Sequence, residues 1–238
     1  MNISDLYLSF LELLIVKNFI NIFDALDETL LLLLISLPVG FILSLIFALG
    51  RVSNKKFISK PISFYIFIVR GTPLLVQIYL IYFGLASIEA VRESFFWIIL
   101  KEPFWCGVVA LTINTVAYGS EIFRGGIQSV TKGQVESGKS LGFSIFELYR
   151  RIIFPIALRK VLPTYGNELI LMVKATSLVS LTTYMEMTGI ARKLMAKTFA
   201  PVEAFVAAGI LYLFLNFLMI QLIKYLEWKY NPHLRLNN

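Results

Sequence analysis

The sequence is poor in charged residues and contains a single cysteine and a single histidine. Charged residues make up 16% of the 238 positions and apolar ones 58%, whereas ordinary globular domains have about a quarter and about half. Because Cys106 and His233 stand alone in their types, neither a disulfide framework nor a clustered His/Cys metal site can form. The first residues lack the cationic region and small-residue cleavage site of a signal peptide, so we expect an unprocessed chain. The low charge makes a membrane protein the first class to test.

Two uncharged runs are long enough to cross a hydrocarbon core, which needs about 20 helical residues. They are Thr29–Leu49 and Ala204–Ile223, and burying both in a soluble protein would need a large globule around them. Three interrupted apolar segments lie between them: Pro61–Ile88, broken by Arg70; Pro103–Ile122, closed by Glu121; and Val161–Leu181, broken by Glu168 and Lys174. The sequence therefore predicts an all-α, polytopic membrane helix bundle with five transmembrane helices.

The two ends of the chain are expected to lie outside this bundle. Residues 6–23 are apolar but include Glu12 and Lys17, which favours a helix lying along the membrane interface, with a sixth span as the alternative. We thus expect an interfacial segment at 1–23, a transmembrane domain at 24–228 and a tail at 229–238.

Loop charges predict the orientation, because cations stay on the cytoplasmic side. The loop after the first span carries four cations and no acid, and the segment Arg124–Lys160 carries seven cations and two acids. The loop before Pro103 is balanced, and the C-terminal tail is basic. We expect an outside N-terminus and an inside C-terminus. Topology and anionic membrane lipid account for much of the net charge of +7, so nucleic-acid binding is not needed.

Gly133–Ser140 reads GQVESGKS and matches the phosphate-binding pattern G-x-x-x-x-G-K-[ST] letter for letter. That loop works only after a buried strand and before a helix, because its amides must converge on the phosphates. The preceding residues, FRGGIQSVTK, contain no strand-like run. We reject nucleotide binding here. Instead we predict an amphipathic helix from about Gly133 to Arg151, with Leu141, Ile145 and Leu148 on one side, suited to docking a soluble partner.

Four motifs in order resemble the permease subunits of polar amino-acid ABC importers, most closely the histidine/lysine/arginine/ornithine type. They are RGTPLLVQ at 70–77, NTVAYGSEIFRG at 114–125, ESGKSLG at 136–142 with IIFP at 152–155, and LPTYGNELILMVKATSL at 162–178. The resemblance covers roughly residues 24–228. The chain departs from it at Ser137 and Gly138, where two alanines are usual, and a helical glycine costs up to about 1 kcal/mol relative to alanine.

The resemblance implies a type I ABC importer permease fold in the bacterial inner membrane, with a cytoplasmic coupling helix inside a loop at about 131–160. It implies separate ATPase subunits that hold ATP and magnesium, a second permease chain, an extracytoplasmic substrate-binding protein and an amino-acid substrate, with no cofactor or catalytic site in this chain. The residues that it assigns to ATPase coupling are Glu136, Ser137, Gly138, Gly142 and Pro155. Glu136 would orient the coupling helix, and Gly142 would permit the sharp turn behind it.

Polar groups inside the membrane are costly and are default candidates for the substrate path. Those predicted here are Arg70, Thr72, Gln77, Asn114, Tyr118, Glu121, Asn167, Glu168, Lys174 and Ser177. Asn114, Tyr118 and Glu121 form one helical stripe, and Lys174 and Ser177 continue the stripe of Asn167.

A carboxylate at Glu168 can meet the cationic group of a basic amino acid, and Arg70 or Lys174 can meet its carboxylate. The alternative for Glu168 and Lys174 is pairing with neighbours or with the other permease. Gly71 and Pro73 are expected to break the second span, and Thr72 and Gln77 can partner the freed backbone groups or only pack helices.

Two other functions remain open at this point. The runner-up is a channel or secondary transporter for small polar solutes that needs no ATPase. Third is a membrane-embedded enzyme, which the lack of a nucleophile–base or metal constellation disfavours.

Overall fold

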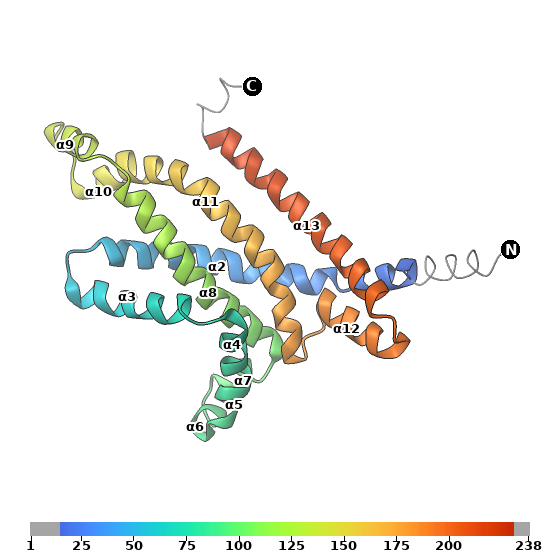
Figure 1. Cartoon of the computed structure of the whole chain (residues 1–238). Coiled ribbons are helices and arrows are strands. Elements are labelled where there is room, and N and C mark those ends of the chain that lie inside the picture. The colour runs from blue at the N-terminus through green and yellow to red at the C-terminus, as the bar shows by residue number, and fades with distance from the viewer. Residues whose placement is uncertain (1–14, 231–238) are drawn as a thin grey trace. The chain divides into compact units, whose positions relative to one another are not determined.

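The computed structural model describes residues 15–230, and within them the chain is helical with no strand (Figure 1). Residues 15–23 are helical; the rest of the predicted interfacial segment and residues 231–238 of the predicted tail lie outside the described part. The later helices are α2 (Leu26–Val52), α3 (Lys56–Arg70), α4 (Leu74–Tyr79), α5 (Leu85–Ser87), α6 (Glu89–Arg92), α7 (Trp97–Leu100), α8 (Pro103–Gln128), α9 (Lys132–Ser140), α10 (Ile145–Leu148), α11 (Phe154–Ala175), α12 (Met187–Thr198) and α13 (Pro201–Tyr230). Two π-helical turns, Leu80–Gly84 and Tyr149–Ile153, and a 3-10 turn, Thr176–Thr182, complete them.

Three of the described helices are long and apolar enough to cross a membrane: α2, α8 and α13. A fourth span results if α3 and Leu74–Ser87 are taken as one broken span. The break lies at Gly71–Pro73, as the sequence predicts: α3 ends at Arg70, and α4 begins one residue after Pro73. The segment predicted as the fourth of five spans forms the 22-residue α11 and the turn after it, but Glu168 and Lys174 interrupt its apolar character. The count of five therefore stays a prediction.

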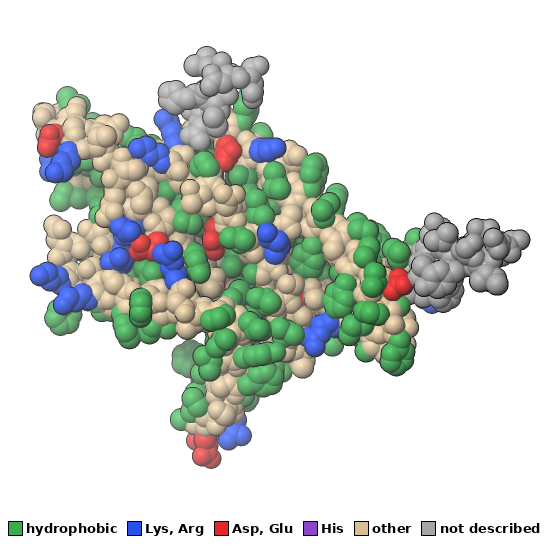
Figure 2. All heavy atoms as spheres, in the orientation of Figure 1, with side chains coloured by type: hydrophobic (Ala, Val, Ile, Leu, Met, Phe, Trp, Pro, Cys, Tyr) green, Lys and Arg blue, Asp and Glu red, His purple; other side chains and the backbone are tan. Residues whose placement is uncertain are grey.

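The described chain forms two compact units. Unit 1 comprises residues up to Ser36, Leu74–Leu111 and Leu171–Leu218; unit 2 comprises Leu37–Pro73, Thr112–Ile170 and residues from Met219 onward. Hydrophobic side chains remain on the surface, for example along α13, where Leu213 is 73% exposed (Figure 2). Outward-facing apolar side chains on a long helix are what a lipid-facing surface requires.

The core of unit 2 is an aromatic cluster from three helices. The rings of Phe41 on α2, Phe123 on α8 and Tyr165 on α11 lie with centroids 5.1–5.5 Å apart. Around them α8 and α11 approach closely, since a Cβ at Gly126 would lie 2.2 Å from Val161 Cγ2 and 3.2 Å from the Ala157 carbonyl. Small residues at such contacts let membrane helices pack backbone to backbone.

A buried carboxylate organises unit 1. Glu186 is fully buried and caps α12 by accepting a hydrogen bond from the Gly189 amide at 3.0 Å. Its other oxygen accepts hydrogen bonds from the Tyr212 hydroxyl of α13 at 2.6 Å and from Thr29 of α2 at 3.5 Å. A buried carboxylate is tolerated when donors surround it, and this one joins α2, α12 and α13. The sequence analysis missed Glu186, although its position three residues before Gly189 is the spacing of a helix cap.

The single amphipathic helix predicted from Gly133 to Arg151 is wrong. α9 ends at Ser140, a turn follows, and α10 begins at Ile145. Gly142 has φ +77°, which only glycine adopts without strain, and Ser144 caps α10 by accepting a hydrogen bond from the Glu147 amide. As a result the three apolar residues do not share a face: Leu148 is 4% exposed, whereas Leu141 and Ile145 are 72% and 76% exposed.

Candidate functional site

Two regions of unit 2 carry most of the residues predicted from the sequence. One is the segment α9–α10, and the other is a set of polar side chains on α3, α8 and α11.

The segment α9–α10 is held in shape by local hydrogen bonds and close packing. Thr131 and Gln134 cap α9 reciprocally, and Ser144 and Glu147 do the same for α10. The hydrogen bonds that Glu147 accepts from the amide and hydroxyl of Ser144 lower the pKa of its carboxyl, with a smaller contribution from Arg151. The segment is thus pre-shaped rather than a flexible loop.

The residues predicted for coupling divide between the exposed and packed sides of this segment. Glu136 and Ser137 are exposed, and Gly142 forms the turn. Gly138 is buried, and a Cβ there would lie 2.5 Å from both Leu148 Cδ2 and Ile152 Cδ1. The glycine that looked like a weakness of α9 therefore lets α9 pack directly on the start of the next helical run. Pro155 lies apart from the turn, in the first turn of α11.

Three predicted path residues from different helices come together in unit 2. The Arg70 guanidinium at the end of α3 lies 5.1 Å from the ring centroid of Tyr118 on α8, within cation–π range. The Arg70 charge also attracts the carboxylate of Glu168 on α11, which is 7% exposed. A cation, an aromatic ring and a buried carboxylate are thereby grouped.

Tyr165 adds a polar atom that the sequence analysis did not single out. Its hydroxyl is buried and has no hydrogen-bond partner among the described residues. It precedes Glu168 by three residues on α11, so both lie on one face of the helix. That spacing could have revealed it in the sequence. A buried hydroxyl without a partner is costly, so a water or a ligand is expected to bond it.

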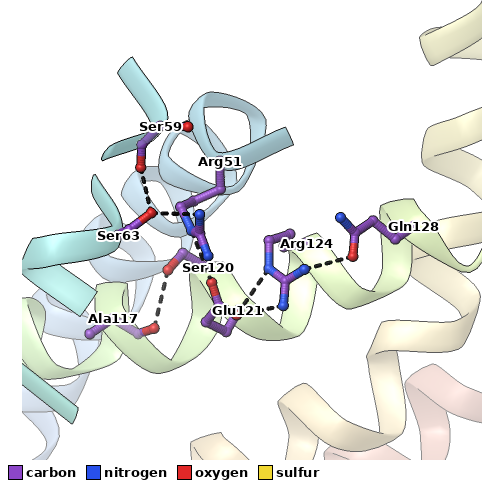
Figure 3. Close-up of polar contacts among 8 residues, drawn as sticks. All are labelled: Arg51, Ser59, Ser63, Ala117, Ser120, Glu121, Arg124 and Gln128. Carbon is purple, nitrogen blue, oxygen red and sulfur yellow. Dashed lines mark hydrogen bonds and ion pairs between the residues drawn. The ribbon is translucent and has the colours of Figure 1, made fainter. Parts of the chain in front are cut away.

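Glu121, by contrast, is already paired (Figure 3). Its Oε1 accepts from Arg51 Nε at 3.2 Å, and its Oε2 accepts from Arg124 Nη2 and Nε at 2.7 and 2.9 Å. Arg51 also donates to Ser63 Oγ at 2.6 Å, so the network joins α2, α3 and α8. Glu121 acts as a brace between helices in this structure.

The remaining path residues are dispersed. Asn114 and Gln77 are buried, whereas Thr72 is exposed and donates to the Ile68 carbonyl at 2.9 Å within its own turn. Asn167 and Lys174 are both exposed on α11. Ser177 lies beyond the end of α11 at Ala175, in the 3-10 turn that follows. Its hydroxyl donates to the Lys174 carbonyl at 2.6 Å.

Comparison with known proteins gives one family and several long matches. Residues 37–231 match the model of the family described as "Binding-protein-dependent transport system inner membrane component". The chain is 46% identical over 223 residues to the nopaline transport system permease protein of Agrobacterium fabrum, covering 93% of this chain and 92% of that protein. It is 41% identical over 214 residues to the histidine/lysine/arginine/ornithine transport system permease protein of Escherichia coli K12, covering 90% of each.

A solved structure agrees with these matches. A chain of the crystal structure described as an amino acid ABC transporter with histidines superposes with a TM-score of 0.79 at 34% identity, covering 90% of this chain and 96% of that chain.

Proposed function

The chain belongs to the family of binding-protein-dependent transport system inner membrane components and is the permease component of an amino-acid ABC importer; on that premise we propose that it transports basic amino acids. It is a multi-pass inner-membrane protein. The observation that carries the substrate proposal is the 41% identity to the histidine/lysine/arginine/ornithine permease over 90% of both chains. The grouping of Arg70, Tyr118 and Glu168 supports it.

The Glu168 carboxylate is suited to the ammonium or guanidinium group of such a substrate. It is buried, so its attraction for a cation is weakly screened. Arg70 can bind the α-carboxylate, and the Tyr165 hydroxyl can take up a hydrogen bond that it lacks within the described chain. Thr72, Gln77, Asn114, Asn167, Lys174 and Ser177 remain proposed contributors along the path, and Glu121 contributes as a brace for the helices that line it.

The segment α9–α10 is proposed to dock on the ATPase subunit. Leu141, Ile145 and Phe146 are each more than 70% exposed, and the carboxylate of Glu136 lies on the same short segment. Apolar side chains displayed on a pre-shaped turn are typical of a surface that a partner covers. The segment lies between α8 and α11 in the chain. When the ATPase subunits bind ATP and close, they would therefore move these two helices.

The P-loop match is proposed to have no nucleotide role. Gly133–Ser140 lies inside α9. The residue before α9 is Thr131, which caps the helix by accepting a hydrogen bond from the Gln134 amide, whereas a phosphate-binding loop would follow a strand. In a helix the later amides bond to carbonyls four residues back and cannot converge on phosphate. ATP and magnesium are accordingly assigned to the separate ATPase, and no cofactor is assigned to this chain.

We further propose five spans, with an outside N-terminus and an inside C-terminus, and pairing with a second permease chain that is identical or related. The extracytoplasmic binding protein that the family name implies delivers the substrate. The division into an interfacial segment at 1–23, a permease domain at 24–228 and a tail at 229–238 is part of this proposal.

The test is uptake by the reconstituted importer. The chain, its ATPase and its binding protein are placed in vesicles, and ATP-dependent uptake of arginine, lysine, histidine, ornithine, nopaline and glutamine is measured. We expect uptake of the basic amino acids, at least ten-fold lower without ATP. Glu136→Ala should reduce it to a similar degree, whereas the matched control Glu89→Ala, at an exposed carboxylate on α6, should leave it unchanged.

The outcomes separate the alternatives. Uptake confined to glutamine or nopaline would refute the basic-amino-acid proposal while leaving the importer intact. Uptake that ignores both ATP and Glu136 would instead support an ATPase-independent channel or secondary transporter.

A further inference from the structure

Unit 2 contains a groove that neither the coupling segment nor the substrate path uses. It lies along the start of α11 and the last turns of α13 and has a volume of about 560 Å³. Its walls are apolar and include Phe154, Pro155, Leu158, Leu162 and Leu226. Two guanidinium groups, from Arg150 and Arg159, and the rings of Phe41 and Tyr230 complete the lining. The groove thus combines a hydrocarbon-like wall with concentrated positive charge.

Aromatic residues on α13 indicate the depth of this groove in the bilayer. Tyr225, Trp228 and Tyr230 on the last turns are 54%, 52% and 53% exposed, and the rings of Tyr225 and Trp228 stack with centroids 6.4 Å apart. Exposed Tyr and Trp at the end of a long apolar helix mark the membrane–water interface, where lipid headgroups lie. Because Tyr230 and Leu226 line the groove, it opens at headgroup level.

The charges of the lining favour an anion. None of the nine residues that line the groove is acidic, and both arginines are exposed. Guanidinium groups bind phosphate in a bidentate manner, and basic pockets between membrane helices on the cytoplasmic side suit anionic lipid headgroups.

We propose that this groove is a binding site for an anionic phospholipid. The phosphate contacts Arg150 and Arg159, and an acyl chain lies along Phe154, Leu158 and Leu226. An aqueous anion would leave the apolar walls unused, and the cationic group of a zwitterionic lipid would be repelled by the two arginines. Pro155 belongs to the groove wall, so the bound lipid also supports the beginning of α11, which follows the α9–α10 segment after one π-helical turn.

The experiment measures lipid retention by the purified full-length chain. Native mass spectra are recorded in detergent during titration with phosphatidylglycerol and, separately, phosphatidylcholine of the same acyl chains. We expect preferential retention of phosphatidylglycerol. The double variant Arg150→Gln/Arg159→Gln should bind it about thirty-fold more weakly, since each of the two cations near a lipid surface contributes about 1 kcal/mol. Arg150→Lys/Arg159→Lys should retain more affinity than the glutamine variant, because it keeps the charge.

The matched control is Lys55→Gln/Lys56→Gln, which removes two exposed cations at the start of α3. It should bind phosphatidylglycerol as the wild type does. Leu158→Trp keeps both arginines and fills the groove, so it should also weaken binding; it covers the case in which the glutamine variant does not fold.

Three results would overturn the proposal. One is equal retention of the two lipids by the wild type. Another is an equal loss in the two double glutamine variants, because that indicates diffuse charge rather than a site. The third is that the Arg150→Gln/Arg159→Gln variant retains lipid as the wild type does but no longer assembles with the second permease chain or the ATPase. That result would make the groove a protein interface.

Discussion

Glu121 holds two arginine side chains at once and connects three helices of unit 2 (Figure 3). Its side chain is 16% exposed, and those of Arg51 and Arg124 are 25% and 28% exposed. Partly buried charges of this kind are stable only while they stay paired. Removing the carboxylate leaves two guanidinium groups facing each other with no anion between them.

Glu121→Gln is therefore expected to lower the stability of the purified chain by about 1.5–3 kcal/mol, the range for hydrogen bonds to charged groups. The measurement is thermal unfolding without substrate, followed by size-exclusion chromatography. Glu89→Gln, at an exposed carboxylate on α6, is the control and should unfold at the wild-type temperature. An unchanged unfolding temperature together with abolished uptake would instead assign Glu121 to the substrate path.

At the scale of elements, the relation of α9 to the following helical run depends on two glycines with different roles. Gly142 permits the turn through its φ of +77°, and Gly138 permits the contact with Leu148 and Ile152. The atoms nearest to Gly138 are side-chain ends, which can move aside for one methyl group but not for a larger side chain.

Gly138→Leu is expected to displace α9 and reduce ATP-driven uptake at least ten-fold, with an overpacking cost of roughly 1–3 kcal/mol. Gly133→Leu is the matched control on the same helix, since nothing lies within 4 Å of a Cβ at that position. Uptake in vesicles and ATP hydrolysis are measured for both variants. An equal loss of uptake in the two variants would contradict this prediction, because it would show that coupling depends on which residues α9 carries and not on the packing beneath Gly138.

For the whole molecule, the proposed orientation can be tested through the single cysteine. Cys106 is fully buried and is replaced first by serine. Single cysteines are then introduced at the exposed positions Lys55, Glu93 and Lys132. With a membrane-impermeant maleimide, intact cells should label Glu93→Cys only, and inside-out vesicles should label Lys55→Cys and Lys132→Cys. Labelling of Lys132→Cys in intact cells would overturn the orientation and the coupling proposal with it.

Local backbone features could be predicted from the sequence, whereas helix continuity and side-chain pairing could not. The break at Gly71 and Pro73 and the turn at Gly142 were confirmed, because the conformational limits of glycine and proline act within a few residues. The prediction of a continuous helix to Arg151 was wrong, because it relied on the spacing of apolar residues and ignored the turn signal of Gly142 and the cap signal of Ser144. Glu121 and Glu168 looked alike as intramembrane carboxylates, yet only Glu121 meets two arginines.

The sequence by itself determined the membrane class, the long apolar helices and the family, since hydropathy and motif order are properties of consecutive residues. Only the tertiary structure decided which polar groups meet. Glu186 bonds to Thr29, 157 positions away, and Arg51 to Glu121, 70 positions away. Such contacts depend on how separate helices pack, and packing is set by the shapes of all their side chains together rather than by any local pattern.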